Sequence, residues 1–305
     1  MKILLLRNPR DQLRHFFLVS SKIPRATIAW MKRLVSTNCL GRAVARHGLL
    51  LILVFAMGCS NFSDFKTAKD LVRERKFYTA IEYYMAFAYK HPEHPRAPEA
   101  LFEIGNIQQM MLGELDKAIE TYSKLVASYP INSYTIQAQR RIADIYKNNF
   151  SNYRQALTEY DKLIRAVPND PSASEVQFEM ADCYTLLHEY DQANLEYETL
   201  IEKYVTYENM EQVYFKKATN AYISGKYDRA IEDYQKVLQL FPETKSKIDV
   251  IFGLASSYDE LDDFVQAQSY YNQVKDTYPS PKVVEIRLQG LEKRRQKKSY
   301  RDTKL

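Results

Sequence analysis

Few side chains in this chain of 305 residues have the types and spacing that chemistry requires. His91 and His94 lie in one His-Pro-Glu-His segment and could bring two imidazoles to a metal ion, but no third ligand lies nearby in sequence, which favours polar turn residues. Cys183 lies in an apolar helical pattern, which favours a packed small side chain over a reactive thiol. Because glycine-rich phosphate loops and nucleophile elbows are missing as well, we predict no enzyme, no metal and no small-molecule substrate.

Cys59 has more specific surroundings. Residues 49–56, LLLILVFA, form a short uncharged apolar run that follows Arg42 and Arg46 and immediately precedes Met57-Gly58-Cys59. This order of basic residues, apolar residues and a small-residue cleavage site is typical of an export signal. A hydrocarbon core of about 30 Å needs roughly 20 apolar residues in a helix, so the run predicts a cleaved signal over residues 1–58.

The tetrapeptide at 56–59, Ala-Met-Gly-Cys, resembles the lipobox of bacterial lipoproteins, in which the cysteine is acylated and becomes residue one. The resemblance implies a covalent lipid on Cys59 and no other cofactor. Cys39 would leave with the signal, so that Cys183 would be the one remaining thiol and no intramolecular disulfide could form. Ser60 stands where an aspartate would resemble an inner-membrane retention signal, so we expect an outer-membrane anchor that faces the periplasm.

The charge distribution also separates the first 58 residues from the rest. They hold ten Lys/Arg and one acidic residue, which leaves 33 Lys/Arg against 37 Asp/Glu in the remainder. A mature chain with this balance loses the main support for nucleic-acid binding. Counting from Met31 would give a signal of ordinary length, so residues 1–30 are interpreted as a start-site artefact or an extended basic region. Residues 59–63 would form the lipid anchor and a short linker.

One phrase recurs six times after this linker. In each copy an alanine is followed four residues later by a tyrosine and seven residues later by an apolar residue, which places all three on one face of a helix. The alanines lie 37 or 38 residues apart, at Ala80, Ala118, Ala156, Ala193, Ala230 and Ala267. We interpret this aromatic ladder as core, in preference to a stacking platform for single strands or sugars.

A small residue lies twelve positions before the alanine in four copies, where a preceding helix would pack closely: Ala68, Ala181, Ala218 and Ala255. Asn106 and Asp144 occupy this place in the other two copies, and the neighbouring Gly105 and Ala143 offer a register shifted by one residue. A proline closes five copies, and Val205 replaces it in the fourth. The pattern resembles the tetratricopeptide repeat, whose helix pairs stack into a right-handed superhelix.

We therefore predict an all-α fold with six repeats over residues 64–281 and a capping helix with a basic tail over 282–305. Val284, Leu288 and Leu291 would close the last repeat. The basic run at 293–298 is interpreted as a solvated helix end, with binding to anionic lipid or to an acidic partner as the alternative.

Stacked helix pairs expose a concave face lined by the first helix of each pair, and such grooves receive extended or helical peptides. Projecting the repeat register onto this face predicts a set of partner-binding residues: Glu103, Ile107, Met110, Arg141, Asp182, Thr219, Tyr222 and Asp259.

The lipobox, the repeats and the phrase YPINSY at 129–134, followed by Gln137, Gln139 and Tyr146, resemble the BamD family of lipoproteins of the outer-membrane β-barrel assembly machine. The resemblance implies a periplasmic scaffold that recruits barrel precursors and docks on other envelope proteins, with neither nucleic acid nor a small molecule as partner. This chain carries six units where five are usual. The alternative is another envelope scaffold, for division and peptidoglycan coordination or for a pilus or secretion apparatus.

Overall fold

The computed structural model describes residues 64–302, so the predicted signal, Cys59 and the linker lie outside the described residues. Within that range every regular element is a helix. A helix at 64–73 is followed by α4 (Phe77–Lys90), α5 (Ala97–Asn106), the π-helix η1 (Ile107–Leu112), α6 (Leu115–Ser128), α7 (Ser133–Asn148), α8 (Tyr153–Ala166), α9 (Ala173–Leu186), α10 (Tyr190–Lys203), α11 (Met210–Ile223), α12 (Tyr227–Leu240), α13 (Lys247–Glu260), α14 (Phe264–Val274) and α15 (Pro281–Asp302).

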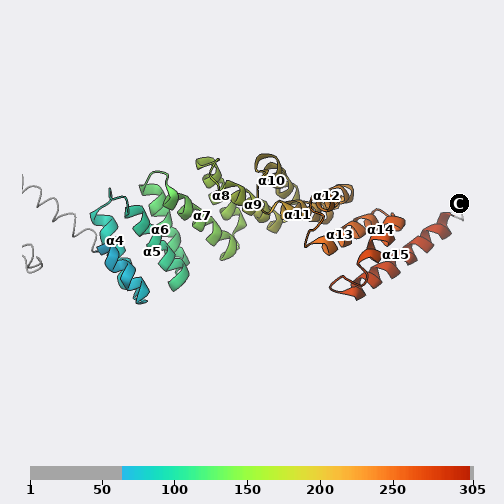
Figure 1. Cartoon of the computed structure of the whole chain (residues 1–305), viewed down its shortest axis with the longest axis horizontal. Coiled ribbons are helices and arrows are strands. Elements are labelled where there is room, and N and C mark those ends of the chain that lie inside the picture. The colour runs from blue at the N-terminus through green and yellow to red at the C-terminus, as the bar shows by residue number, and fades with distance from the viewer. Residues whose placement is uncertain (1–63, 303–305) are drawn as a thin grey trace, which may run out of the picture. The chain divides into compact units, whose positions relative to one another are not determined.

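The helices from Thr67 onward belong to one compact unit, in which each helix packs mainly on its neighbours in sequence (Figure 1). Each repeat consists of a first helix and a second helix. The first helices are 64–73, α5 with η1, α7, α9, α11 and α13, and the second helices are α4, α6, α8, α10, α12 and α14. The predicted all-α stack of six helix pairs followed by a further helix is thus confirmed. Within residues 64–302 no helix combines the length and the apolar character that a membrane crossing would require.

The aromatic ladder forms the core of the stack, as predicted. All six repeat alanines are fully buried, and the six tyrosines that follow them are buried as well. Tyr122 and Leu125 of α6 share one core cluster with Ala138 and Ile142 of α7, because each second helix packs on the first helix of the next repeat. Continuous burial along the stack follows, because every pair covers the apolar face that its neighbour leaves open.

The turn within each pair contains one residue in the left-handed conformation. These residues recur with the same spacing as the repeat alanines, at Arg75, Gly113, Ser151, His188, Gly225 and Asp262. Only two of the six are glycine, although a side chain in this conformation costs roughly 1 kcal/mol. The packing of the two helices therefore fixes the left-handed conformation in this turn, whichever residue type lies there.

Repeats two and three contain one extra residue in this turn. The N–H of Glu114 donates to Gln108 O at 2.8 Å and that of Asn152 to Tyr146 O at 2.8 Å, six residues back. The equivalent bond in repeat four joins Glu189 to Tyr184, five residues back, at 2.9 Å. In repeat two the π-helix η1 accommodates the extra residue.

This insertion settles the register in the two irregular copies. Gly105 and Ala143 are the small residues that the second helices contact, and both are buried. A Cβ on Gly105 would overlap the ring of Tyr122, so a close approach of α5 and α6 requires glycine there. The shift by one residue that the sequence left open is confirmed.

The helix α15 takes the place of a first helix, and within residues 64–302 no second helix follows it. Val284 and Leu291 of α15 are buried against α13 and α14, and Leu288 packs beside them. Arg294 forms an ion pair with Asp259, and Lys298 lies 3.7 Å from Asp262. The predicted capping stripe is confirmed, while two members of the basic tail pair with the preceding repeat.

Candidate partner-binding surface

The first helices α5, α7, α9, α11 and α13 together form a surface that we call the first-helix face. A row of polar side chains runs along it, each bound to the hydroxyl of a ladder tyrosine. Tyr122 donates to Asn106 at 2.8 Å, Tyr160 to Asp144 at 2.6 Å and Tyr197 to Asp182 at 2.9 Å. In repeats five and six the tyrosine hydroxyl lies 3.2 Å from the hydroxyl of Thr219 and of Ser256, respectively.

This polar row follows from the ladder. A buried phenol needs a hydrogen-bond partner, because an unsatisfied buried hydroxyl costs roughly 1–3 kcal/mol. Asn106 and Asp144, which break the expected pattern of small residues, therefore serve as acceptors for Tyr122 and Tyr160. In repeats two to six, the residue directly after the small residue is the hydrogen-bond partner of the ladder tyrosine.

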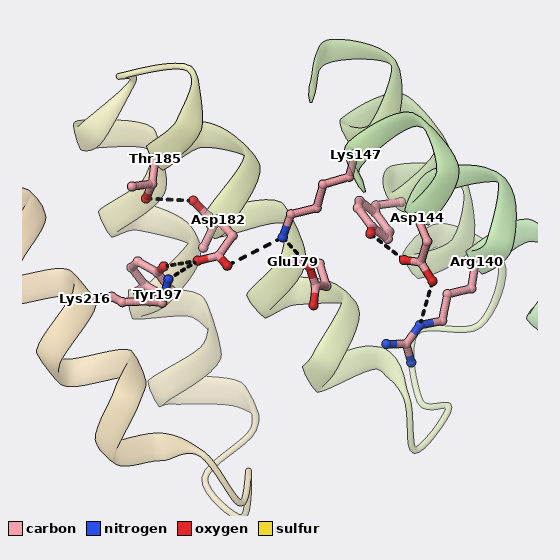
Figure 2. A network of polar contacts seen from close by, with 10 residues as sticks. Arg140, Asp144, Lys147, Glu179, Asp182, Thr185, Tyr197 and Lys216 are labelled. Carbon is pink, nitrogen blue, oxygen red and sulfur yellow. Dashed lines mark hydrogen bonds and ion pairs between the residues drawn. The ribbon is translucent and has the colours of Figure 1, made fainter. Parts of the chain in front are cut away.

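Ion pairs between successive repeats cover the centre of the first-helix face (Figure 2). Lys147 of α7 bonds to Glu179 of α9 and lies 3.5 Å from Asp182. Lys216 of α11 approaches the other oxygen of Asp182 at 2.8 Å. Arg140 of α7 pairs with Glu175 of α9 at 2.8 Å and lies 3.8 Å from Asp144. We call these seven residues the central network.

The contacts within the central network favour the charged forms of Lys147 and Glu175. Burial disfavours the charge of Lys147, but the hydrogen bond to Glu179 and the carboxylates of Glu179 and Asp182 outweigh it and raise the pKa of Lys147. The hydrogen bond from Arg140 lowers the pKa of Glu175. Three basic side chains face four acidic side chains in the network, and they pair with one another. The network stabilises the stacking of α7, α9 and α11 and is poorly suited to clamp a charged ligand.

The predicted binding residues divide into accessible and buried positions. Met110 of η1 is exposed, and Glu103, Arg141 and Tyr222 are half-buried. Burial raises the pKa of Glu103, against the opposing hydrogen bond from Asn106. Partner binding by these four residues stays a prediction.

Asp182 and Thr219 are half-buried and already engaged. Asp182 belongs to the central network, and the Thr219 hydroxyl donates to Phe215 O at 2.9 Å besides its contact with Tyr234. Their role on the first-helix face is therefore structural in the first instance, and any contact with a partner stays a prediction.

Two predicted positions need correction. The side chain of Ile107 is 3% exposed and belongs to the core, because the register shift in repeat two turns it inward. Asp259 is 5% exposed and pairs with Arg294 of α15. Neither presents a free surface to a partner, and the arrival of α15 over α13 explains the burial of Asp259.

Sequence reasoning named Met110 but missed the apolar row to which it belongs, at the carboxyl ends of the first helices. Met110, Leu186 and Ile223 are each about half exposed, and each lies five residues after the small residue of its repeat. We call these three residues the end row. Apolar residues at one repeated position are the signal that could have identified it, once the register of repeat two was known.

The histidines and the thiol weighed in the sequence have structural roles. The rings of His91 and His94 pack on Phe87 at centroid distances of 5.7 and 5.1 Å, and His94 Nδ1 accepts the N–H of Arg96 at 3.0 Å. Burial raises the pKa of Cys183 to about 12, so the thiol is protonated at neutral pH. Among residues 64–302 no three His, Cys, Asp or Glu side chains gather around a common metal position.

The YPINSY phrase has a local explanation. Asn132 caps α7, since its side chain accepts the N–H of Tyr134 at 2.8 Å and that of Thr135 at 3.2 Å, and Thr135 Oγ1 accepts the N–H of Asn132 in return. The ring of Tyr134 packs on Phe102 at 5.8 Å, and Gln139 donates to the buried Glu159 at 2.8 Å. These contacts account for the phrase by helix capping and packing.

Comparison with known proteins identifies the repeats. Tetratricopeptide-repeat family models match residues 99–130, 211–244 and 249–281. The chain contains tetratricopeptide repeats. No curated protein matches the sequence.

Solved structures resemble the chain in fold. YrrB, described as a tetratricopeptide-repeat protein with an unusual peptide-binding site, has a TM-score of 0.50 and 16% identity, over 65% of this chain and 95% of its own. A tetratricopeptide-repeat protein from Parabacteroides merdae ATCC 43184 has a TM-score of 0.47 and 20% identity, over 70% and 78%. PilW, a type IV pilus biogenesis factor, has a TM-score of 0.46 and 13% identity, over 76% and 98%. Repeats of this type form scaffolds for protein–protein interaction.

Proposed function

We propose that the chain is a lipid-anchored periplasmic scaffold that brings protein partners together at the outer membrane, in the manner of the BamD family. The observation that carries the proposal is the order of the sequence: a tetrapeptide that resembles a lipobox ends at Cys59 and is followed within five residues by a continuous stack of repeats. A tether this short keeps a protein-binding stack at the membrane surface, where precursors of outer-membrane proteins are assembled.

The first-helix face supports binding through apolar contacts. The end row offers exposed Met and aliphatic side chains on three different repeats, and methionine adapts to partners of varied shape. The central network beside it is paired and rigid, so binding would need little ordering of the scaffold. An extended segment of a barrel precursor, with apolar side chains on alternate positions, suits such a row.

A photo-crosslinking amino acid at Leu186 and at Ile223 tests this function in cells. Asp161 and Glu198, on second helices of the third and fourth repeats, are the matched control positions. We expect crosslinks from the end-row positions to barrel precursors or to a barrel-assembly protein, and none from the controls. Crosslinks to septal proteins, or to a pilus or secretion protein, would overturn the barrel-assembly role in favour of another envelope scaffold.

Metabolic labelling with a fatty acid tests the anchor. The wild-type chain should incorporate label and Cys59→Ser should not, because only the cysteine sulfur at the lipobox can receive the diacylglyceryl group. Equal labelling of both would overturn the anchor.

A further inference from the structure

The outward side of α4 differs from that of the other second helices. Tyr78, Met85 and Tyr89 lie seven and four residues apart on one face of α4, with the exposed Glu82 between the first two, and are 62%, 44% and 88% exposed. They lie opposite the buried Tyr84 and Phe87, so the stack does not cover them. We call Tyr78, Met85 and Tyr89 the α4 stripe.

The equivalent positions of the other repeats are almost all polar. The place of Met85 is taken by Ser123, Asp161, Glu198, Gln235 and Asn272. The place of Tyr89 is taken by Ala127, Arg165, Glu202, Gln239 and Asp276. The place of Tyr78 is taken by Asp116, Arg154, Asp191, Asp228 and Val265. Packing of the repeat does not require apolar residues here, so the α4 stripe is a property of the first repeat alone.

The charge around the α4 stripe also differs from that of the later repeats. Residues 64–91 contain six Lys/Arg and four Asp/Glu, whereas residues 92–288 contain 20 Lys/Arg and 31 Asp/Glu. Arg73, Arg75 and Lys76 lie just before α4, and Lys90 ends it. A surface of anionic headgroups would therefore attract the first repeat and repel the acidic repeats that follow.

We propose that the α4 stripe lies in the headgroup region of the membrane that carries the Cys59 lipid. This inference rests on the proposed function, which supplies the anchor. Four linker residues and Cys59 extend at most about 17 Å, at ~3.4 Å each, so the first repeat stays at the bilayer surface. The turn at 74–76 is closed by the bond from Lys76 N to Leu71 O at 2.9 Å, and α4 then runs back along residues 67–73.

The chemistry of the α4 stripe fits the membrane interface better than a protein groove. Tyrosine has an apolar ring and a polar hydroxyl, and it is enriched where headgroups meet acyl chains. The Tyr78 hydroxyl donates to Glu114 at 3.3 Å, which steadies its ring on the surface, and Tyr89 is fully open to the solvent side. A lipid at Cys59 and a stripe on α4 give two points of attachment, which would fix the orientation of the stack relative to the membrane.

Single tryptophan reporters test the contact directly. The only tryptophan of the chain is Trp30, within the predicted signal, so the processed protein contains none. Tyr89→Trp places a stripe reporter in the α4 stripe, and Glu202→Trp places a control reporter at the equivalent position of α10. The full chain of each variant is expressed, and the processed protein is reconstituted into vesicles of phosphatidylethanolamine, phosphatidylglycerol and a brominated phosphatidylcholine, beside vesicles without bromine.

Brominated acyl chains should quench the fluorescence of the stripe reporter several-fold more strongly than that of the control reporter, which should fluoresce as in unbrominated vesicles. Acylated protein with an unquenched stripe reporter would overturn the inference and leave the anchor intact. Protection of the stripe reporter only after addition of an envelope protein would also overturn it, by making the α4 stripe a protein interface. Quenching of the stripe reporter in protein that is not acylated would uphold the membrane contact and overturn the anchor.

Discussion

The central network and the α4 stripe both lie at variable positions of the repeat, but the side chains of the network are paired and those of the stripe are exposed. In the network, charged side chains of α7, α9 and α11 bind one another across successive repeats. In the α4 stripe, large apolar side chains stay exposed without a covering helix. Charged side chains that pair with one another mainly affect how the repeats stack. An exposed apolar surface indicates a binding site for a partner. Exposure and pairing, more than charge, therefore separate structural from binding surfaces in this chain.

The largest expected effect concerns the core that both regions share. Ala230→Glu would place an unpaired charge between α11 and α12, where Ala230 is fully buried, and should lower the free energy of unfolding by roughly 3–5 kcal/mol. Thermal and denaturant unfolding, monitored by circular dichroism, measures this loss of stability. Arg229→Glu, one residue earlier and exposed, is the control and should unfold nearly like wild type. Similar unfolding of both variants would contradict the repeat register.

The tyrosine ladder predicts a loss of stability in alkali. Burial raises the pKa of Tyr234 from 10.0 to about 12. Because the folded state binds this proton more tightly, its contribution is fully present below pH 10 and is lost as the pH rises towards 12. The loss is about 3 kcal/mol for this residue. Denaturant unfolding measured across this range should show it, and Tyr234→Phe should have a shallower pH dependence than wild type. An unchanged slope would show that this tyrosine ionises freely in the folded chain.

Removing the centre of the network should cost somewhat less. Asp182→Ala deprives Lys147, Lys216 and the hydroxyl of Tyr197 of a shared acceptor, and we expect a loss of about 1–3 kcal/mol. Asp191→Ala, in the same repeat as Asp182, breaks an exposed pair with Lys226 of the next repeat and should change stability little. If the two variants lose the same stability, the network contributes no more than an ordinary surface ion pair. Denaturant titration distinguishes these results.

The smallest effects belong to the turns. Ser151→Gly relieves a left-handed side chain and should stabilise the chain by roughly 0.5–1 kcal/mol, whereas Gly113→Ala introduces one and should destabilise it by a similar amount. A Cβ at Gly113 meets no atom within 4 Å, so the cost is conformational alone. Unfolding curves of the two variants, recorded under the same conditions, measure both changes in stability. Destabilisation by Ser151→Gly would show that the serine makes a compensating contact.

Local periodicity made the core predictable. An alanine and a tyrosine four residues apart share a helix face wherever the helix lies, so the ladder could be read before any packing was known. The same reasoning failed for Ile107, because the extra residue in the turn of repeat two makes a count back from Ala118 miss the small residue by one position. It also missed Leu186 and Ile223, since an exposed apolar residue near a helix end has no periodic signature within a single repeat.

The helix pairs, their number and the identity of the buried ladder could be predicted before folding was considered, because these depend on spacings within one helix and on a repeat long enough to recognise. The pairing of polar groups between repeats could not. Contacts such as Lys147 with Asp182 and Arg294 with Asp259 join residues 35 positions apart. Their formation depends on the rotation and offset of stacked helices, which a single extra residue in a turn can change.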